Sequence, residues 1–184
     1  MLLFGLFRFR LLLPTEQTDE KYVLIALMTT ILGSLAGYSQ QKPVKILSIT
    51  NGQQLLVEVE QHGRAVRLAC LQAPRFGQEP WAEFAQSVIE SHVKRGDQAF
   101  FELRSRDVYG RLVGRLFVNG KDLGAQLVQQ GSVMAWDGFV GRCDDLNYSE
   151  LETMAKGAGL GLWSATPPLE RPWDVMEAAG GGEP

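Results

Sequence analysis

The chain has 184 residues, of which 45% are hydrophobic and 21% charged, so it is long enough for one domain with a real core plus tails. This composition excludes a wholly disordered protein. The formal net charge is −3, and residues 42–174 contain 15 basic and 16 acidic side chains. Phosphate contacts supply most of the affinity of nonspecific nucleic-acid binders. The near-neutral charge therefore argues against such strong binding and limits any basic site to a local cluster.

The first forty residues contain two apolar runs. The second run, Tyr22–Tyr38, has no charged side chain and follows Lys21. It is slightly short for a membrane span and slightly long for the apolar region of a signal peptide. Ser34 and Ala36 place small residues where a signal peptidase would cut. We predict that residues 1–40 export the chain to the periplasm or cell exterior, or anchor it in a membrane; a buried core helix is the alternative.

Residues 41–165 have the pattern of a folded domain. Short β-branched or alternating apolar runs, separated by turn signals such as Asn51-Gly52, predict five strands. We expect these strands at residues 44–49, 55–59, 65–71, 98–103 and 112–118. Apolar residues at helical spacing predict three helices, at residues 80–93, 122–130 and 146–158, with an extended stretch at 133–136 between the last two. Periodicity alone therefore predicts a small α+β domain with a five-stranded sheet.

Residues 166–184 are expected to form a carboxy-terminal tail. The aromatic segment Arg171–Asp174 favours a docked tail, because a tryptophan is seldom left in solvent. The following segment, Ala178–Pro184, is rich in glycine and is expected to be disordered.

The chain has two cysteines, Cys70 and Cys143, and neither lies in a Cys-x-x-Cys motif or near a histidine cluster. A metal site built on them is therefore not expected. In an exported chain they can form one disulfide, which would close a loop of about 70 residues and stabilise the fold by roughly 4 kcal/mol. Two thiols are the alternative, and the sequence leaves both open.

Four motifs occur in this pattern. They are Asn51-Gly-Gln-Gln54, Arg67-Leu-Ala-Cys-Leu-Gln-Ala-Pro-Arg75, Asp107-Val-Tyr-Gly-Arg111 and Gly159-Leu-Gly-Leu-Trp-Ser164. Together they resemble the staphylococcal nuclease-like (thermonuclease) family over roughly residues 44–163. The resemblance implies an α+β fold in which a five-stranded OB-type β-barrel is joined by about three helices. It also implies the family's activity, that of a calcium-dependent nuclease (phosphodiesterase), which would contact nucleic acid.

The resemblance retains the family's arginines and replaces its acidic residues. Arg67 and Arg111 match the two family arginines. The calcium-binding aspartates match Gln53 and Gln72, and the general-base glutamate matches Arg75. Calcium requires several oxygen ligands with carboxylates among them, so we expect no bound calcium or other cofactor. Loss of a general base alone typically slows a reaction by about 10² to 10⁴-fold.

These replacements would gather Arg67, Arg75 and Arg111 around one pocket, which would then suit an anion without a metal. Tyr109 and Trp136 could add aromatic surfaces on which a base would stack. The sequence therefore predicts a binding site for a phosphate, a nucleotide or the end of a strand at these five residues.

A structural interpretation of the same residues competes with this one. Arg67 would pair with Glu58 or Glu60 across a hairpin, and Arg111 would pair with Asp107. The aromatic residues would then belong to the core. Both interpretations stay open at this stage.

Three hypotheses about function follow. The first is a catalytically impaired nuclease-family domain that weakly binds a nucleotide, single-stranded nucleic acid or another partner. The second is an active metal-dependent nuclease with an altered site, in which Glu79 replaces the lost base. The third is a barrel with a purely structural role. Whether the chain is an enzyme, and in which oligomeric state it acts, stays open.

Overall fold

The computed structural model describes residues 40–136 and 143–180. The chain divides into two units, Met1–Tyr38 and Ser39–Pro184, and the described residues all belong to the second. The apolar run Tyr22–Tyr38 lies outside them, so its role in export or anchoring stays a prediction. Within the described ranges, no helix is both long and apolar enough to cross a membrane.

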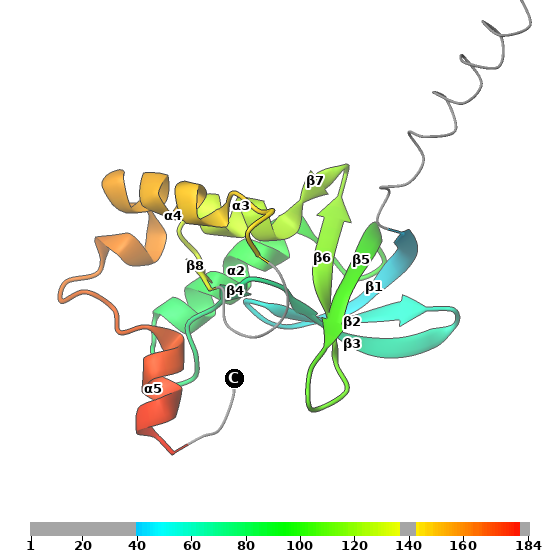
Figure 1. Cartoon of the computed structure of the whole chain (residues 1–184), viewed down its shortest axis with the longest axis horizontal. Helices are drawn as coiled ribbons and strands as arrows, with labels where there is room; N and C mark the ends of the chain where they lie inside the picture. Colours follow the sequence, from blue (N-terminus) through cyan, green and yellow to red (C-terminus); the bar gives the residue numbers. More distant parts are fainter. Residues whose placement is uncertain (1–39, 137–142, 181–184) are drawn as a thin grey trace, which may run out of the picture. The chain divides into compact units, whose positions relative to one another are not determined.

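The second unit is built on a closed β-barrel of five strands (Figure 1). Neighbouring strands pair in the order β3-β2-β1-β5-β6, all antiparallel, and a parallel pairing of β3 with β6 closes the barrel. This arrangement confirms the expected OB-type α+β fold. The strands are β1 (Gln41–Asn51), β2 (Gln54–Val59), β3 (His62–Leu68), β5 (Gln98–Arg106) and β6 (Leu112–Val118).

Three very short strands complete the sheets. β7 (Lys121–Asp122) extends β6, and β4 (Leu71–Gln72) pairs with β8 (Met134–Ala135) in a separate ladder. The β4–β8 ladder follows directly from β3, so it carries the chain from the barrel toward the helices. Its second residue, Gln72, is one of the two glutamines that the resemblance sets at calcium positions of the family.

The three expected helices are α2 (Trp81–His92), α3 (Leu123–Gln129) and α4 (Tyr148–Gly157), and they gather to one side of the barrel (Figure 1). A 3₁₀ turn, η2 (Gly161–Ser164), follows α4. The tail then forms a fourth helix, α5 (Pro172–Ala178), with Pro172 in its first turn. The expectation of disorder was therefore wrong for Ala178, which ends α5, and residues 181–184 lie outside the described ranges.

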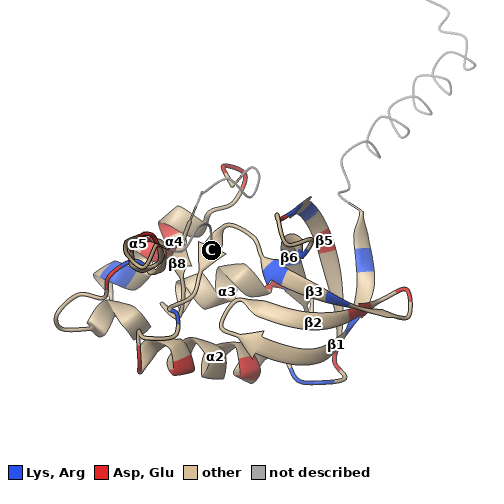
Figure 2. Cartoon of the chain, turned by 90° about the horizontal axis from the view of Figure 1, so that it is seen from below, with Lys and Arg blue, Asp and Glu red and all other residues tan. Residues whose placement is uncertain are grey.

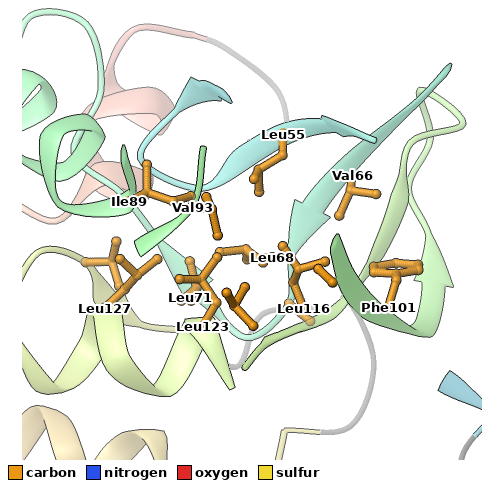
Figure 3. Packing of buried hydrophobic residues seen from close by; sticks show 14 of the residues in the cluster. Leu55, Val66, Leu68, Leu71, Ile89, Val93, Phe101, Leu116, Leu123 and Leu127 are labelled. Atoms are coloured by element: carbon orange, nitrogen blue, oxygen red, sulfur yellow. The ribbon is translucent and has the colours of Figure 1, made fainter. Parts of the chain in front are cut away.

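The hydrophobic core lies between the barrel and its helices (Figure 3). Leu55, Leu68 and Leu116 point inward from the strands, and each is at most 1% exposed. Ile89 of α2 and Leu127 of α3 meet them from the helical side and are fully buried. Burying side chains of this size stabilises the fold by about 1.5–3 kcal/mol each. The barrel and helices thus share one core.

Cys70 and Cys143 form a disulfide. Their Cα atoms are 5.7 Å apart, and the two residues are separated by 73 positions in the chain. The structure thereby decides between the two alternatives that the sequence left open. The bridge ties the connection between β3 and β4 to the segment that leads into α4.

A group of six charged and hydroxyl side chains, here called the carboxylate network, joins the barrel to α3 and α4. Its members are Glu102, Arg104, Arg115, Asp122, Asp145 and Tyr148. Asp122 accepts the backbone N–H groups that begin α3, an ion pair of 2.9 Å from Arg115 and the hydroxyl of Tyr148 at 2.9 Å. Burial and the charge of Asp122 raise the pKa of Tyr148 far above its ordinary value, so the phenol stays a donor.

Candidate functional site

Gln53 is fixed by a tight turn between β1 and β2. The side chain of Asn51 accepts the backbone N–H of Gln53 at 3.0 Å. A Cβ on Gly52 would lie 2.6 Å from the Cβ of Ala85, so α2 packs directly on this turn and only glycine fits. Gln53 is 3% exposed, and its Oε1 accepts the backbone N–H of Ala73 at 2.6 Å. The amide oxygen that stands at a family calcium position therefore already holds two chain segments together.

Gln72 lies in β4 and is fully buried. Its Oε1 accepts a long hydrogen bond of 3.4 Å from Nη2 of Arg75. Burial, and next the positive charge of Arg111, lower the pKa of Arg75 below its ordinary value. Burial and the nearby charge of Arg111 therefore both destabilise the charged form of Arg75.

The sheet register places Arg67 and Arg111 side by side. Arg67 is 1% exposed and pairs in parallel register with Val113 of β6. Arg111 precedes Val113 by two positions, so the standard strand spacings separate the two arginine Cα atoms by about 8 Å. Residues two apart along a strand share a face, so an extended backbone at Arg111, immediately before β6, would direct its side chain to the same side of the barrel as that of Arg67.

Arg111 forms the ion pair with Asp107 that the structural interpretation expects. Its Nε donates to Oδ2 of Asp107, whose side chain is 1% exposed. Oδ1 of Asp107 accepts the backbone N–H groups of Tyr109 and Arg111, at 3.0 and 2.9 Å. Burial would raise the pKa of Asp107, but these bonds and the positive charge of Arg111 lower it below its ordinary value. Asp107 is therefore an anion that orients Arg111.

The expected partners of Arg67 lie elsewhere. Glu60 pairs with Lys42 at 3.0 Å. The register of the β2–β3 hairpin sets Arg67 opposite Gln54, while Glu58 faces Gly63 at the other end of the hairpin. The hairpin therefore does not bring Arg67 next to either glutamate.

The two aromatic residues lie against the arginines. The ring of Tyr109 is 5.0 Å from Cζ of Arg111, and 66% of this residue is exposed, so it is not a core residue. The ring of Trp136 is 5.7 Å from Cζ of Arg67. Trp136 is half-buried and also packs on Trp173 of α5, with ring centroids 6.2 Å apart. Both contacts are of the cation–π type, which leaves the guanidinium edges for hydrogen bonds.

These side chains form a group that we call the arginine pocket: Arg67, Gln72, Arg75 and Arg111. Three of its buried N–H groups find no acceptor among the described residues, namely Nε2 of Gln72, Nε of Arg75 and Nη2 of Arg111. Buried donors are nearly always satisfied, because leaving one unpaired costs roughly 1–3 kcal/mol. The pocket therefore concentrates unsatisfied donors and positive charge, which is the chemistry that an oxyanion complements.

A hollow of about 430 Å³ adjoins the arginine pocket. Gln53 and Arg75 line it, together with Glu79 and Glu83 from the start of α2. Phe76 stands at its rim and is 98% exposed. The described residues contain no group of three or more His, Cys, Asp or Glu side chains arranged to hold a metal ion. Glu79 and Glu83 are thus two carboxylates that line the hollow with Arg75, too few to hold a metal ion by themselves.

Residues 65–165 match the sequence model of the family described as staphylococcal nuclease homologue. The chain belongs to the staphylococcal nuclease family. Protein ParB of Escherichia coli is 31% identical over 142 residues, which cover 70% of this chain and 76% of that protein. The chain and its bacterial relative thus share most of their length.

Two fungal relatives of this staphylococcal nuclease family member have nuclease names. The protein named "Probable endonuclease LCL3" from Podospora anserina is 27% identical over 149 residues, covering 72% of this chain and 50% of that protein. The protein of the same name from Pyricularia oryzae is 31% identical over 121 residues, covering 59% and 47%. The chain spans about half the length of these fungal proteins.

The predicted site residues of this family member do come together. Arg75 lies close to Gln72 and Arg111, Tyr109 lies on Arg111, and Trp136 lies on Arg67, which the strand register sets near Arg111. Their roles in binding or catalysis stay predictions. Sequence reasoning missed Gln78 and Trp173, which hold the pocket from the carboxy-terminal side. The segment containing Trp173 was expected to dock, but no sequence signal singled out Gln78.

Proposed function

We propose that this staphylococcal nuclease family domain binds a phosphate group in the arginine pocket without a metal ion. The phosphate would belong to a nucleotide or to the end of single-stranded nucleic acid. The observation that carries this proposal is the set of three buried N–H groups, on Gln72, Arg75 and Arg111, for which residues 40–136 and 143–180 provide no acceptor. A phosphate offers several acceptor oxygens and negative charge, and planar guanidinium groups match its geometry.

The pocket residues do not fit calcium. Calcium prefers six to eight oxygen ligands, with carboxylates among them. Oε1 of Gln53 accepts the Ala73 N–H, and Oε1 of Gln72 accepts from Arg75. A dication would also stand beside Arg75 and Arg111, whose charges already oppose each other. The same neutral amides cannot take a proton from water near neutral pH, which supports an impaired nuclease.

Titration of the full-length protein with inorganic phosphate, and with a short 5′-phosphorylated thymidine oligonucleotide, tests the proposal. We expect both ligands to bind equally well in calcium and in EDTA. The Arg75→Gln variant should weaken phosphate binding about tenfold, because a charge-assisted hydrogen bond contributes about 1.5–3 kcal/mol. Arg95→Gln, at an exposed turn after α2, is the matched control and should bind like the wild type. Calcium-dependent binding, or none, would contradict the proposal.

A second candidate is an active nuclease that uses Glu79 as its base. The observation that favours it is the position of Glu79, which lines the same hollow as Arg75. A carboxylate there could take a proton from water attacking a phosphate held by the arginines.

Cleavage of single-stranded DNA and RNA by the full-length protein distinguishes the two candidates. Cleavage that needs a divalent metal, stops with EDTA and is lost in Glu79→Gln, Arg67→Ala and Arg111→Ala would establish the nuclease. If the wild type cleaves no faster than the Arg67→Ala and Arg111→Ala variants, the nuclease candidate is wrong and the phosphate-binding candidate is supported. Glu90→Gln, at an exposed position of α2, controls for the loss of one carboxylate.

A further inference from the structure

Gln78 forms hydrogen bonds with both the N–H and the carbonyl group of Arg75. Its Oε1 accepts the backbone N–H of Arg75 at 3.0 Å, and its own backbone N–H donates to the carbonyl of Arg75 at 2.8 Å. Gln78 is only 6% exposed, although it lies in a surface loop between β4 and α2. The loop between β4 and α2 is therefore held by hydrogen bonds at the backbone of Arg75.

The other half of the Gln78 amide reaches the carboxy-terminal segment. Its Nε2 donates to the carbonyl oxygen of Glu170 at 2.7 Å, a contact between residues 92 positions apart. Both functions of the amide, one acceptor and one donor, are thus used. A side-chain amide supplies an acceptor oxygen and a donor nitrogen at the same time, which a carboxylate or an ammonium group does not.

The same segment touches the pocket a second time. Trp173, in the first turn of α5, packs on Trp136, which itself lies against Arg67. Arg171 lies 5.3 Å from the ring of Trp173 and is held by an ion pair of 2.7 Å with Asp174. One short stretch of chain therefore supports Arg75 through Gln78 and Arg67 through Trp136.

We infer that Gln78 is a positioning residue of the arginine pocket and that residues 170–178 form its supporting wall. This inference rests on the proposed phosphate binding. Arg75 is a cation held at a cost next to Arg111, and such a side chain would turn toward water if its backbone were released. Gln78 and the wall keep it directed into the pocket, so the donors are in place before the ligand arrives.

The Gln78→Ala variant of the full-length protein tests this role. We expect its affinity for inorganic phosphate to fall about tenfold, the effect of losing hydrogen bonds that hold the binding group. Hydrogen exchange at the Arg75 amide should speed up strongly, because that N–H loses its acceptor. Gln129→Ala, exposed at the end of α3, is the matched control and should change neither quantity.

The Gln78→Glu variant separates positioning from a general loss of structure. A carboxylate keeps the acceptor for the Arg75 N–H but cannot donate to the Glu170 carbonyl; a protonated carboxyl group does both. Phosphate affinity relative to wild type should therefore recover as the pH falls from 7 to 5, and Gln78→Ala should show no such recovery. Trp173→Ala should weaken phosphate binding by a smaller factor.

The outcomes keep this inference distinct from the proposed function. If wild-type protein does not bind phosphate, the proposed function is wrong. Hydrogen exchange at the Arg75 amide then remains as the test of whether Gln78 holds the backbone of Arg75. If the wild type binds phosphate and Gln78→Ala binds within twofold of it, the positioning role is overturned. Unchanged exchange at Arg75 in Gln78→Ala would overturn it as well.

Discussion

Two groups of arginines on the same barrel have opposite surroundings. In the carboxylate network, Arg104 and Arg115 contact three acidic side chains, and Arg104 meets Asp145 through two bonds of 2.8 Å. In the arginine pocket, Arg111 pairs with Asp107, and Arg75 lies close to the positive charge of Arg111. Among the described residues, the arginine pocket contains three buried N–H groups without an acceptor, on Gln72, Arg75 and Arg111. The six side chains of the carboxylate network contain none.

The difference teaches what each group is for. Each charge of the network has a partner, so the removal of one member would leave a buried charge unpaired at the junction of barrel and helices and destabilise the fold. A pocket with surplus positive charge weakens the fold, and proteins retain such costs where a ligand needs them. Basic and acidic residues are interspersed over barrel and helices (Figure 2), so the surplus is local rather than a property of the whole surface.

The largest expected effect comes from the disulfide, because it connects the two groups. Cys70 lies between Arg67 and Gln72 of the pocket, and Cys143 lies two residues before Asp145 of the network. Closing a loop of this size stabilises a fold by roughly 4 kcal/mol. We expect reduction of the wild type to lower the free energy of unfolding in urea by about that amount.

A Cys70→Ala, Cys143→Ala double variant provides the control for this prediction. It should unfold at a similarly low urea concentration with or without reductant. If the wild type kept its full stability under reducing conditions, the bridge would not hold the two regions together.

A smaller loss is expected from the network alone. Asp122→Ala removes the cap of α3, the partner of Arg115 and the acceptor of Tyr148. Breaking a buried ion pair on one side costs about 3–5 kcal/mol, and the partial exposure of Arg115 places this variant near 3 kcal/mol. Asp144→Ala, at an exposed position three residues before Asn147, the cap of α4, is the matched control. Equal urea midpoints for the two variants would contradict a stabilising network.

The contrast between the two groups also shows what the sequence can predict. Alternating apolar residues predicted all five barrel strands, because every strand presents one face to the core. The ends were less accurate: β1 begins at Gln41 and β5 continues to Arg106, three residues beyond the expected limits. Polar residues at strand ends have no apolar partner to reveal them. Helix α5 has seven residues and was recognised only as a docked segment.

Motif spacing predicted the members of the arginine pocket and the pairing of Arg111 with Asp107, because that pair lies four residues apart. The contacts that decide what the pocket can do were not predictable in this way. Gln53 reaches Ala73 across 20 positions and Gln78 reaches Glu170 across 92. Such bonds depend on how the loops fold back on each other, and a glutamine in a polar loop gives no periodic signal.

The arginine pocket should respond to mutation with the opposite sign. Burial and the charge of Arg111 lower the pKa of Arg75, so its cationic form destabilises the folded state. We therefore expect Arg75→Met to raise the free energy of unfolding slightly, since it keeps the apolar contacts and removes the charge, while solvent screening at this partly exposed side chain keeps the gain small. The same variant should lose the rise in melting temperature that phosphate gives the wild type.

Arg95→Met controls for the loss of a positive charge at an exposed site, and its stability should change little. A clear destabilisation by Arg75→Met would show that Arg75 is a structural residue paired like those of the network.

The smallest expected effect is a dependence of the free energy of unfolding on pH, and it comes from Asp107, the carboxylate that pairs with Arg111. The folded-state pKa of Asp107 is lower than its ordinary value, because Arg111 and two backbone N–H groups bind the charged form. The stability that Asp107 contributes is therefore fully present above the unfolded pKa of about 3.9 and is lost as the pH falls through the folded pKa. Asp107→Asn removes this contribution.

The difference in unfolding free energy between wild type and Asp107→Asn, measured in urea, should stay constant from pH 7 to about 5 and shrink below about 4. Asp145 and Glu60 also have lowered pKa values, but both are present in wild type and variant, so their effects cancel in the difference. A difference that grows toward low pH would mean that Arg111 binds the neutral form of Asp107 better.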